Sequence, residues 1–503
     1  MKVYLIGHDF LYEMENLVRL FFPCDRIEMI ENATGHEDPG QDDGAWLTIA
    51  PGKEDTLQYT VKVTLLGQTP CERQESGPAT DPPAEQERRL GVLLFTVLQT
   101  LTGQTPAWGI ITGVHPVKLL RQKSEEVGLL SAEAFFRDKW LVSDEKIALM
   151  RRVLKVQEPY VALSKPNSCS LYLSVPFCPS RCSYCSFISQ AVEGAKKLIE
   201  PYVTLLLREI EETAAIARQV GLQVQSVYIG GGTPTTFSAS QLTAVIEKVR
   251  ERFDLSHCVE FTVEAGRPDT VTKEKLQALL SGGVTRISIN PQSMHNDVLR
   301  AIGRRHTVED TWRAFSLARD MGFDNINMDL IAGLPLDTPE KFRQTLKAIE
   351  KLSPESVTVH TLALKHAARM MRDEEVRDNH RRGEAARQMV EDAGRELTRQ
   401  GYAPYYLYRQ SRMAGNLENT GWSRKGKECL YNIITMDEIH TVLSCGAGGV
   451  TKLCDPFSTD IKRVFNFKYS YEYVSRFEEI LQRKKQIVTG YEEFLHRAGK
   501  ICL

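Results

Sequence analysis

Residues 171–187 read LYLSVPFCPSRCSYCSF, a short apolar run followed at once by Cys178, Cys182 and Cys185. Three thiolates at this spacing can each bind one iron of a cubic [4Fe–4S] cluster and leave the fourth iron open to another ligand, whereas full protein ligation needs four cysteines. Zinc needs four ligands, or three and a water, and no further His or Cys lies at the usual adjacent spacing. The motif therefore predicts an open-site cluster, with a zinc site and an inert cysteine-rich turn as alternatives.

Short β-rich runs alternate with helical segments from Leu171 onward. The six runs are 171–175, 226–230, 259–265, 285–290, 325–331 and 356–361. Alternation of this kind is typical of parallel βαβ crossovers. Six βα units are fewer than the eight of a complete barrel. We therefore predict an α/β fold with a partial (βα)6 barrel, whose open side would admit a large, flat substrate.

Two further regions flank the predicted barrel, which we place at residues 165–365. Residues 1–150 mix strand-like and helical patterns and predict an α+β domain of unknown role. Within them, the polar, Pro- and Gly-rich residues 67–89 predict an exposed loop, followed by a helix at 91–101. Residues 366–503 predict a mixed α/β region that covers the substrate.

Composition excludes several classes of function. The 503 residues carry 63 Lys and Arg against 65 Asp and Glu, a net charge of −2, which argues against a nucleic-acid partner. The sequence contains no apolar run of membrane-spanning length, and acidic residues interrupt the first segment, MKVYLIGHDFLYEMENL. Eleven cysteines, an odd number, do not indicate a disulfide framework. We expect a cytoplasmic protein without a membrane span.

Several motifs follow the cysteine loop in a fixed order. They are IGGGTPT, VEAGRPD, RISINPQS, DLIAGLP and PYYLYRQSRMAGNLENTG. Together with the cysteine loop, they resemble the oxygen-independent coproporphyrinogen III oxidase family of radical S-adenosylmethionine (SAM) enzymes, from about Leu171 to about Lys452. The long N-terminal extension and the YYLYRQ…AGNLEN segment are most similar to the firmicute Z-type coproporphyrinogen dehydrogenase branch.

The resemblance implies a set of cofactor-binding residues at the strand ends. SAM would occupy the open iron of the cluster, and the family pattern suggests a second SAM in the same pocket. Tyr172, Gly231 and Glu264 match the first site, and Tyr184, Gly232, Thr233, Gln292, Arg304, Asp329 and Ala363 match the second, with Val450 as a looser match. Taken singly, the glycines fit a plain turn and Glu264 fits a solvated rim residue.

A run of donors follows the aromatic residues 405–408. The candidates for substrate contact in it are Arg409, Gln410, Arg412 and Asn416. Coproporphyrinogen III carries propionates around an apolar macrocycle, so its site needs donors at the edge and apolar contact on the faces. The alternative is a structural loop that stabilises the open side of the barrel.

The resemblance implies oxidative decarboxylation of coproporphyrinogen III to protoporphyrinogen IX in haem biosynthesis, driven by a 5′-deoxyadenosyl radical and supplied with electrons by a flavodoxin or ferredoxin. One departure weakens it: Phe187 stands where well-known members have a fourth cysteine, a feature shared with the haem-chaperone branch. His306 could ligate haem, or could be a solvated or hydrogen-bonded rim histidine. A haem-binding chaperone and an anaerobic haem-degrading methyltransferase are therefore the alternative functions.

Overall fold

The computed structural model describes the chain apart from residues 24, 36–41, 186–188, 364–378, 411–412 and 498–503. The chain forms two compact units. The first comprises Met1–Arg152, Asp373–Arg387 and Tyr408–Glu418, and the second comprises Val153–Arg372, Gln388–Leu407 and Asn419–Leu503. The predicted domain limits at 1–150, 165–365 and 366–503 stay a prediction.

The second unit is built on one sheet of order β14-β15-β13-β12-β11-β10-β9-β6-β16-β17-β18. Its strands are β6 (Ser168–Val175), β9 (Gln223–Gly231), β10 (Glu260–Glu264), β11 (Arg286–Ser288), β12 (Ile326–Ala332), β13 (Ser356–Thr361), β14 (Ala403–Tyr408), β15 (Asn419–Ser423), β16 (Thr441–Cys445), β17 (Val450–Cys454) and β18 (Ile461–Phe465). A short pair, β7 (Phe177–Cys178) and β8 (Gln190–Ala191), lies apart from it.

The six predicted strands are β6 and β9 to β13, and successive members of this set pair in parallel. Successive residues of these strands face opposite sides of the sheet: apolar residues such as Leu171, Val263 and Val359 fill one face, and buried polar residues line the other, among them Ser170, Ser226, Thr262, Arg286, Asn327 and Thr358. The sheet does not close on itself: antiparallel β15 extends it beyond β13, and β16 extends it beyond β6. The predicted α/β partial barrel is confirmed.

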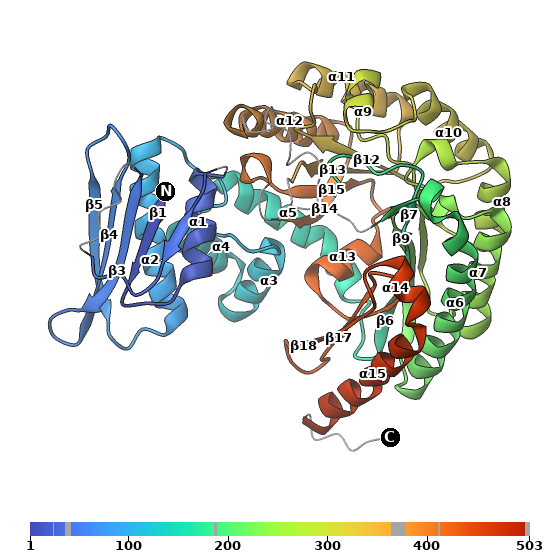
Figure 1. Ribbon diagram of the computed structural model, residues 1–503, viewed down its shortest axis with the longest axis horizontal. Coiled ribbons are helices and arrows are strands. Elements are labelled where there is room, and N and C mark those ends of the chain that lie inside the picture. The colour runs from blue at the N-terminus through green and yellow to red at the C-terminus, as the bar shows by residue number, and fades with distance from the viewer. Residues whose placement is uncertain (24, 36–41, 186–188, 364–378, 411–412, 498–503) are drawn as a thin grey trace. The chain divides into compact units, whose positions relative to one another are not determined.

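Helices cover the outer face of this sheet. They are α6 (Val192–Gln219), α7 (Ala239–Arg252), α8 (Lys273–Ser281), α9 (Asn296–Ala301), α10 (Val308–Asp320) and α11 (Pro339–Leu352). The later helices of the chain are α12 (Asn379–Arg399), α13 (Leu430–Asp437), α14 (Ser470–Ser475) and α15 (Phe477–Arg497). In α11, Phe342, Leu346 and Ile349 form one buried stripe, so amphipathic spacing turns the helix toward the sheet. Figure 1 shows α13 on the opposite face from α6 and α7.

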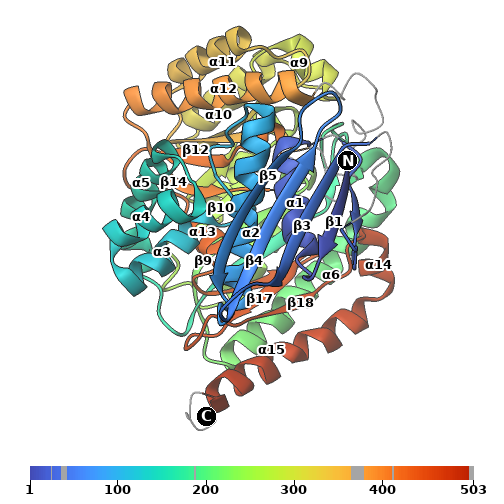
Figure 2. The same cartoon turned by 90° about the vertical axis from the view of Figure 1, so that its left-hand side faces the viewer.

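The first unit has a five-stranded sheet of order β2-β1-β3-β4-β5. Its elements are β1 (Lys2–Ile6), α1 (Leu11–Phe21), β2 (Glu28–Ile30), β3 (Gly44–Pro51), β4 (Thr56–Thr64), β5 (Cys71–Pro78), α2 (Pro83–Thr102), α3 (Pro116–Val127), α4 (Leu129–Trp140) and α5 (Asp144–Val161), the last of which continues into the second unit. Leu17, Val61 and Leu94 belong to one core between the sheet and the helices α1 and α2 (Figure 2).

The prediction of an exposed loop at residues 67–89 is wrong. Residues 71–78 form β5, which pairs with β4 along its whole length, and α2 begins at Pro83. The strand is polar because it lies at the edge of the sheet, where charged residues discourage pairing with another chain. Pro83 suits the first helical position because its missing N–H has no partner there in any case.

A buried carboxylate connects the last elements of the second unit to α6. Glu209 on α6 is fully buried and accepts hydrogen bonds from the Gly446 amide at 2.7 Å, Asn466 Nδ2 at 2.7 Å and the Tyr473 hydroxyl at 2.6 Å. Lys484 Nζ on α15, also buried, lies 3.0 Å from Glu209 Oε1. Glu209 therefore holds the turn after β16, α14 and α15 together.

None of the helices in the described part of the chain could cross a membrane.

We expect Glu209→Gln to destabilise the protein by about 3–5 kcal/mol, because it leaves the buried Lys484 ammonium without its counter-charge. Urea-denaturation midpoints would measure the loss. The matched control is Arg208→Ala on the preceding residue, whose exposed ion pair with Glu478 contributes about 0–1 kcal/mol. Equal effects of the two substitutions would contradict this account of the buried pair.

Candidate functional site

The three predicted cluster ligands lie in one loop that leaves the end of β6. The loop is closed by the pairing of β7 with β8, and the Cys185 amide donates to the Cys182 carbonyl at 3.2 Å. Cys182 is buried, and Cys178 and Cys185 are half-buried. Phe187 lies outside the described residues.

This donor set fits an iron–sulfur cluster. Among the described residues, no three His, Cys, Asp or Glu side chains converge on a point that a single metal ion could occupy. A cubic [4Fe–4S] cluster does not require its ligands to converge on one point, because each thiolate binds a different iron and the three sulfurs stay apart. The three cysteines of this short loop, none of them in a disulfide, fit such a cluster.

The glycine turn after β9 lies against the cysteine loop. A Cβ on Gly232 would be 2.6 Å from the Phe177 carbonyl oxygen and 3.0 Å from Cys178 Sγ, so only glycine fits. Gly231 has φ of +111°, which also favours glycine. The Thr233 hydroxyl points to Cys178 Sγ at 3.6 Å. The structure thus brings Gly231, Gly232 and Thr233 together with Cys178.

A second glycine turn, between β16 and β17, contacts the same backbone. The Tyr202 hydroxyl donates to the Ser174 carbonyl at 2.7 Å and accepts from the Ala447 amide at 2.8 Å. A Cβ on Gly446 would be 2.4 Å from that Ser174 oxygen. Val450 begins β17 directly after this turn.

Glu264 ends β10 beside a stack of three tyrosines. The ring centroid of Tyr228 lies 6.2 Å from that of Tyr172 and 4.4 Å from that of Tyr431, and the centroids of Tyr172 and Tyr431 lie 5.9 Å apart, so each ring is next to both others. The Tyr228 hydroxyl donates to Glu264 Oε1 at 2.6 Å. Burial raises the pKa of Glu264 to about 7. A half-buried carboxylate of this kind suits a cationic ligand, whose charge would favour its ionised form.

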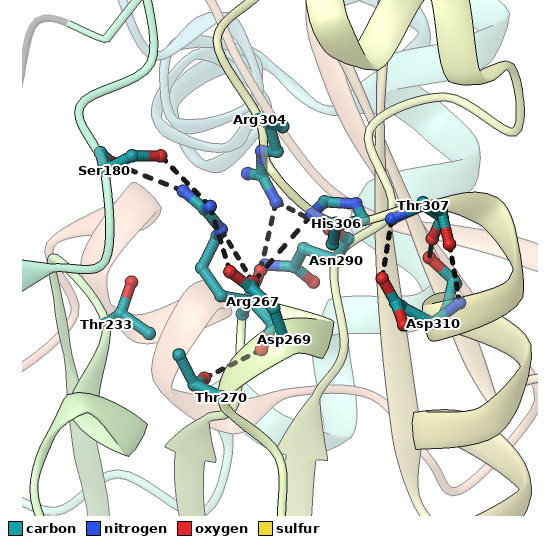
Figure 3. A network of polar contacts seen from close by, with 12 residues as sticks. Ser180, Thr233, Arg267, Asp269, Thr270, Asn290, Arg304, His306, Thr307 and Asp310 are labelled. Carbon is teal, nitrogen blue, oxygen red and sulfur yellow. Dashed lines mark hydrogen bonds and ion pairs between the residues drawn. The ribbon is translucent and has the colours of Figure 1, made fainter.

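Arg304 and Tyr184 lie together on another side of the loop. Arg304 is buried and donates to the Asn290 carbonyl at 2.9 Å and to the Tyr184 hydroxyl at 3.2 Å. Arg267, which the sequence interpretation did not single out although it belongs to VEAGRPD, donates to Cys182 Sγ at 3.9 Å. Arg267, which follows β10, and Arg304, which follows α9, thus place two guanidinium groups near Cys182. Figure 3 shows these two arginine side chains in one polar network.

Gln292 and Asp329 meet through their backbones. Gln292 has φ of +70°, and its amide donates to the Asp329 carbonyl at 2.9 Å. Burial works to raise the pKa of Asp329, but hydrogen bonds from His360 and Asn327 hold it below its usual value. Asp329 is therefore ionised at neutral pH. Ala363 lies two residues beyond the end of β13.

His306 is not a solvated or hydrogen-bonded rim residue, as one interpretation of the sequence had it. Its side chain is buried, and neither ring nitrogen has a hydrogen-bond partner within the described residues. Burial and the charges of Arg304 and Arg267 lower its pKa to about 3. The imidazole is therefore neutral at physiological pH.

The substrate candidates belong to the first unit, whereas the cofactor candidates belong to the second. Arg409 is buried there, lies over the Trp108 ring, and donates to the Ile111 carbonyl and to Asn416 Oδ1 at 2.8 Å. Glu418, from the same segment, accepts from Trp108 Nε1 at 2.8 Å. Arg409 and Asn416 thus have partners within the unit, the Gln410 amide contacts Met413 Sδ, and Arg412 lies outside the described residues. Their contact with substrate stays a prediction.

Comparison with known proteins identifies the family. The Radical SAM superfamily model matches residues 172–349. Over 494 residues, the chain is 37% identical to the oxygen-independent coproporphyrinogen-III oxidase-like protein HemZ of Bacillus subtilis, and the alignment covers 96% of each protein. The chain belongs to the oxygen-independent coproporphyrinogen III oxidase family. The predicted resemblance is confirmed.

Other family relatives carry different names. The chain is 28% identical to the heme chaperone HemW of Haemophilus influenzae over 65% of this chain and 82% of that protein. The solved structure of the coproporphyrinogen III oxidase HemN of Escherichia coli, a radical SAM enzyme, has a TM-score of 0.52 and 24% identity over 64% of this chain and 71% of that one. This last likeness concerns the fold. The family as a whole implies a [4Fe–4S] cluster and SAM.

We expect Cys182→Ser to abolish retention of a reconstituted iron–sulfur cluster, because two thiolates hold the cubane too weakly. Iron and sulfide content, together with visible absorbance, would measure the loss. Cys258→Ser is the matched control, since Cys258 lies in the same unit, outside the loop, and contacts Glu260. An iron content in Cys182→Ser equal to that of the control would contradict the assignment of the ligands.

We expect Glu264→Gln to remove a pH dependence from the stability of the apoprotein. Between pH 4.5, the ordinary pKa, and about 7, the folded chain holds one more proton at Glu264 than the unfolded chain, so its stability falls as pH rises. The loss reaches the order of 3 kcal/mol. Denaturation midpoints across this range would show it, with exposed Glu251→Gln on α7 as control. A parallel decline in Glu264→Gln and wild type would contradict it.

Proposed function

We propose that the protein catalyses the oxygen-independent oxidative decarboxylation of coproporphyrinogen III to protoporphyrinogen IX. One observation carries the proposal: the similarity to HemZ extends over 96% of both proteins and so includes the first unit as well as the sheet. The similarity to the chaperone HemW covers only 65% of this chain. The electron donor, a flavodoxin or ferredoxin, and a cytoplasmic location stay predictions from the sequence.

In this proposal Cys178, Cys182 and Cys185 hold the cluster, and the glycines of the turn after β9 leave room for SAM beside it. When bound, the cluster and SAM supply the one-electron cleavage and hydrogen abstraction that precede loss of CO2 from a propionate. The chain itself supplies binding and exclusion of water. Gly232 lets the backbone approach closely, because any side chain there would collide with the loop.

Charge would orient the ligands in this site. Glu264, beside the tyrosine stack, would accept the ammonium group of one SAM, with Tyr172 and Gly231 nearby. Arg304 could bind a carboxylate, a contact suited to its planar guanidinium group. Arg304, Tyr184, Gly232, Thr233, Gln292, Asp329 and Ala363 would hold the second SAM, with Val450 at the edge. Donors of the segment 409–416 would meet the propionates of the substrate.

A haem chaperone is the second candidate. His306 favours it, because both ring nitrogens are neutral and lack hydrogen-bond partners among the described residues, a state suited to iron ligation. The similarity to HemW, over 82% of that protein, also favours it. His306 is nevertheless buried, so haem would reach it only if the surrounding residues moved.

An anaerobic turnover assay distinguishes the dehydrogenase from the haem chaperone. The reconstituted protein receives a reductant, SAM and coproporphyrinogen III, and mass spectrometry follows the tetrapyrrole and 5′-deoxyadenosine together. We expect protoporphyrinogen IX to accumulate in step with 5′-deoxyadenosine, and Cys182→Ser to form neither. If 5′-deoxyadenosine forms without decarboxylated product, the dehydrogenase proposal fails. A stoichiometric Soret change with haem that is lost in His306→Ala would then support the chaperone.

A further inference from the structure

Arg267 is held against the cysteine loop by several contacts at once. It follows β10 and is 3% exposed. Its guanidinium group donates to the Ser180 carbonyl at 3.3 Å, to the Ser180 hydroxyl at 3.1 Å and to Cys182 Sγ at 3.9 Å. Figure 3 shows the side chain directed from the end of the strand toward Ser180. A fixed positive charge therefore lies beside one predicted cluster ligand.

One carboxylate partly balances this charge from the solvent side. Asp269 Oδ1 lies 3.2 Å from Arg267 Nε, and its Oδ2 lies 3.4 Å from Nη2. The Asp269 side chain is 24% exposed, whereas that of Arg267 is 4% exposed. Water therefore screens the negative charge more than the positive one, and the field at the Cys182 sulfur stays positive.

The other groups in this network do not cancel that field. Arg304 lies on the same side of the loop, and although burial opposes its charge, Tyr184 and Cys182 raise its pKa. His306 faces Arg304, Arg267, Asp269 and Asp310, and burial with the two arginines keeps it neutral. The side of the loop around Cys182 thus carries two buried positive charges and one exposed counter-charge.

We propose that Arg267 tunes the cluster: it raises the reduction potential of the [4Fe–4S] cluster held by Cys178, Cys182 and Cys185. Reduction transfers one electron from an external one-electron donor and converts [4Fe–4S]2+ to [4Fe–4S]+, with no chemical change in Arg267. Positive charge and hydrogen bonding at a ligand sulfur stabilise the more negative, reduced state. Arg267 acts through Cys182 and touches no reacting atom. This inference rests on the proposed cluster.

Two substitutions with opposite expected signs test it. In Arg267→Gln the midpoint potential of the cluster falls. A tenfold lower ratio of reduced to oxidised cluster at a fixed potential corresponds to a fall of about 59 mV in that midpoint. In Asp269→Asn, which removes the counter-charge and keeps the shape, the midpoint rises. Arg252→Gln is the control, because it removes the same charge from an exposed ion pair on α7. Anaerobic redox titration followed by electron paramagnetic resonance gives the midpoints, with iron content measured on each sample.

A structural role alone would not produce opposite shifts. Midpoints that stay at the wild-type value, or that move in the same direction in both variants, overturn the role of Arg267. If Arg267→Gln loses its iron, Asp269→Asn decides the question alone, since Arg267 remains in place: a raised midpoint supports the proposal and an unchanged one overturns it. Failure of the wild-type protein to bind iron at all would instead reject the proposed cluster.

Discussion

The backbone from Ser174 to Cys178 packs between two turns, and at one position in each turn only glycine is small enough to fit against it. A Cβ on Gly446 would be 2.4 Å from the Ser174 oxygen, and one on Gly232 would be 2.6 Å from the Phe177 oxygen. Any side chain at these two positions would collide with backbone atoms, which have little freedom to move aside in a close-packed interior. The start of the cysteine loop, and with it Cys178, is therefore located by main-chain packing. The strand, the helix α6 and the C-terminal elements all depend on this arrangement.

Buried charges attach the later parts of the chain to this arrangement. Glu209 binds the turn that contains Gly446, and Glu260 on β10 accepts from the amides of Leu430 and Tyr431 at 2.7 and 3.3 Å. A carboxylate at the first turn of α13 also suits the positive end of the helix dipole. Since Tyr431 belongs to the tyrosine stack, Glu260 indirectly holds the surroundings of Glu264. Burying these charges is favourable only because each has fixed partners.

The sequence predicts the central sheet of the second unit well, but it predicts neither the extensions of that sheet nor the edge strand of the sheet in the first unit. The strands β6 and β9 to β13 are apolar runs separated by helices, so local pattern suffices. β5 is polar because it is an edge strand, and the pairing of β16 with β6 depends on contacts that no local pattern records. The cysteines and glycines are recognisable from spacing. Tyr228 and Arg267 are not, because their importance comes from neighbours on other strands. The burial of His306 likewise depends on tertiary packing.

The parallel pairing of β16 with β6 has a consequence for folding while the protein is being synthesised. Leu173 pairs with Cys445. One edge of β6, the strand that leads into the cysteine loop, therefore has no partner until β16 has been synthesised. At about 5–20 residues per second, the ribosome takes on the order of tens of seconds to cover that interval. During this time an apolar edge strand is open to wrong partners. The start of the cysteine loop therefore gains its packing against Gly446 only after the chain has been synthesised as far as β16 and the turn that follows it.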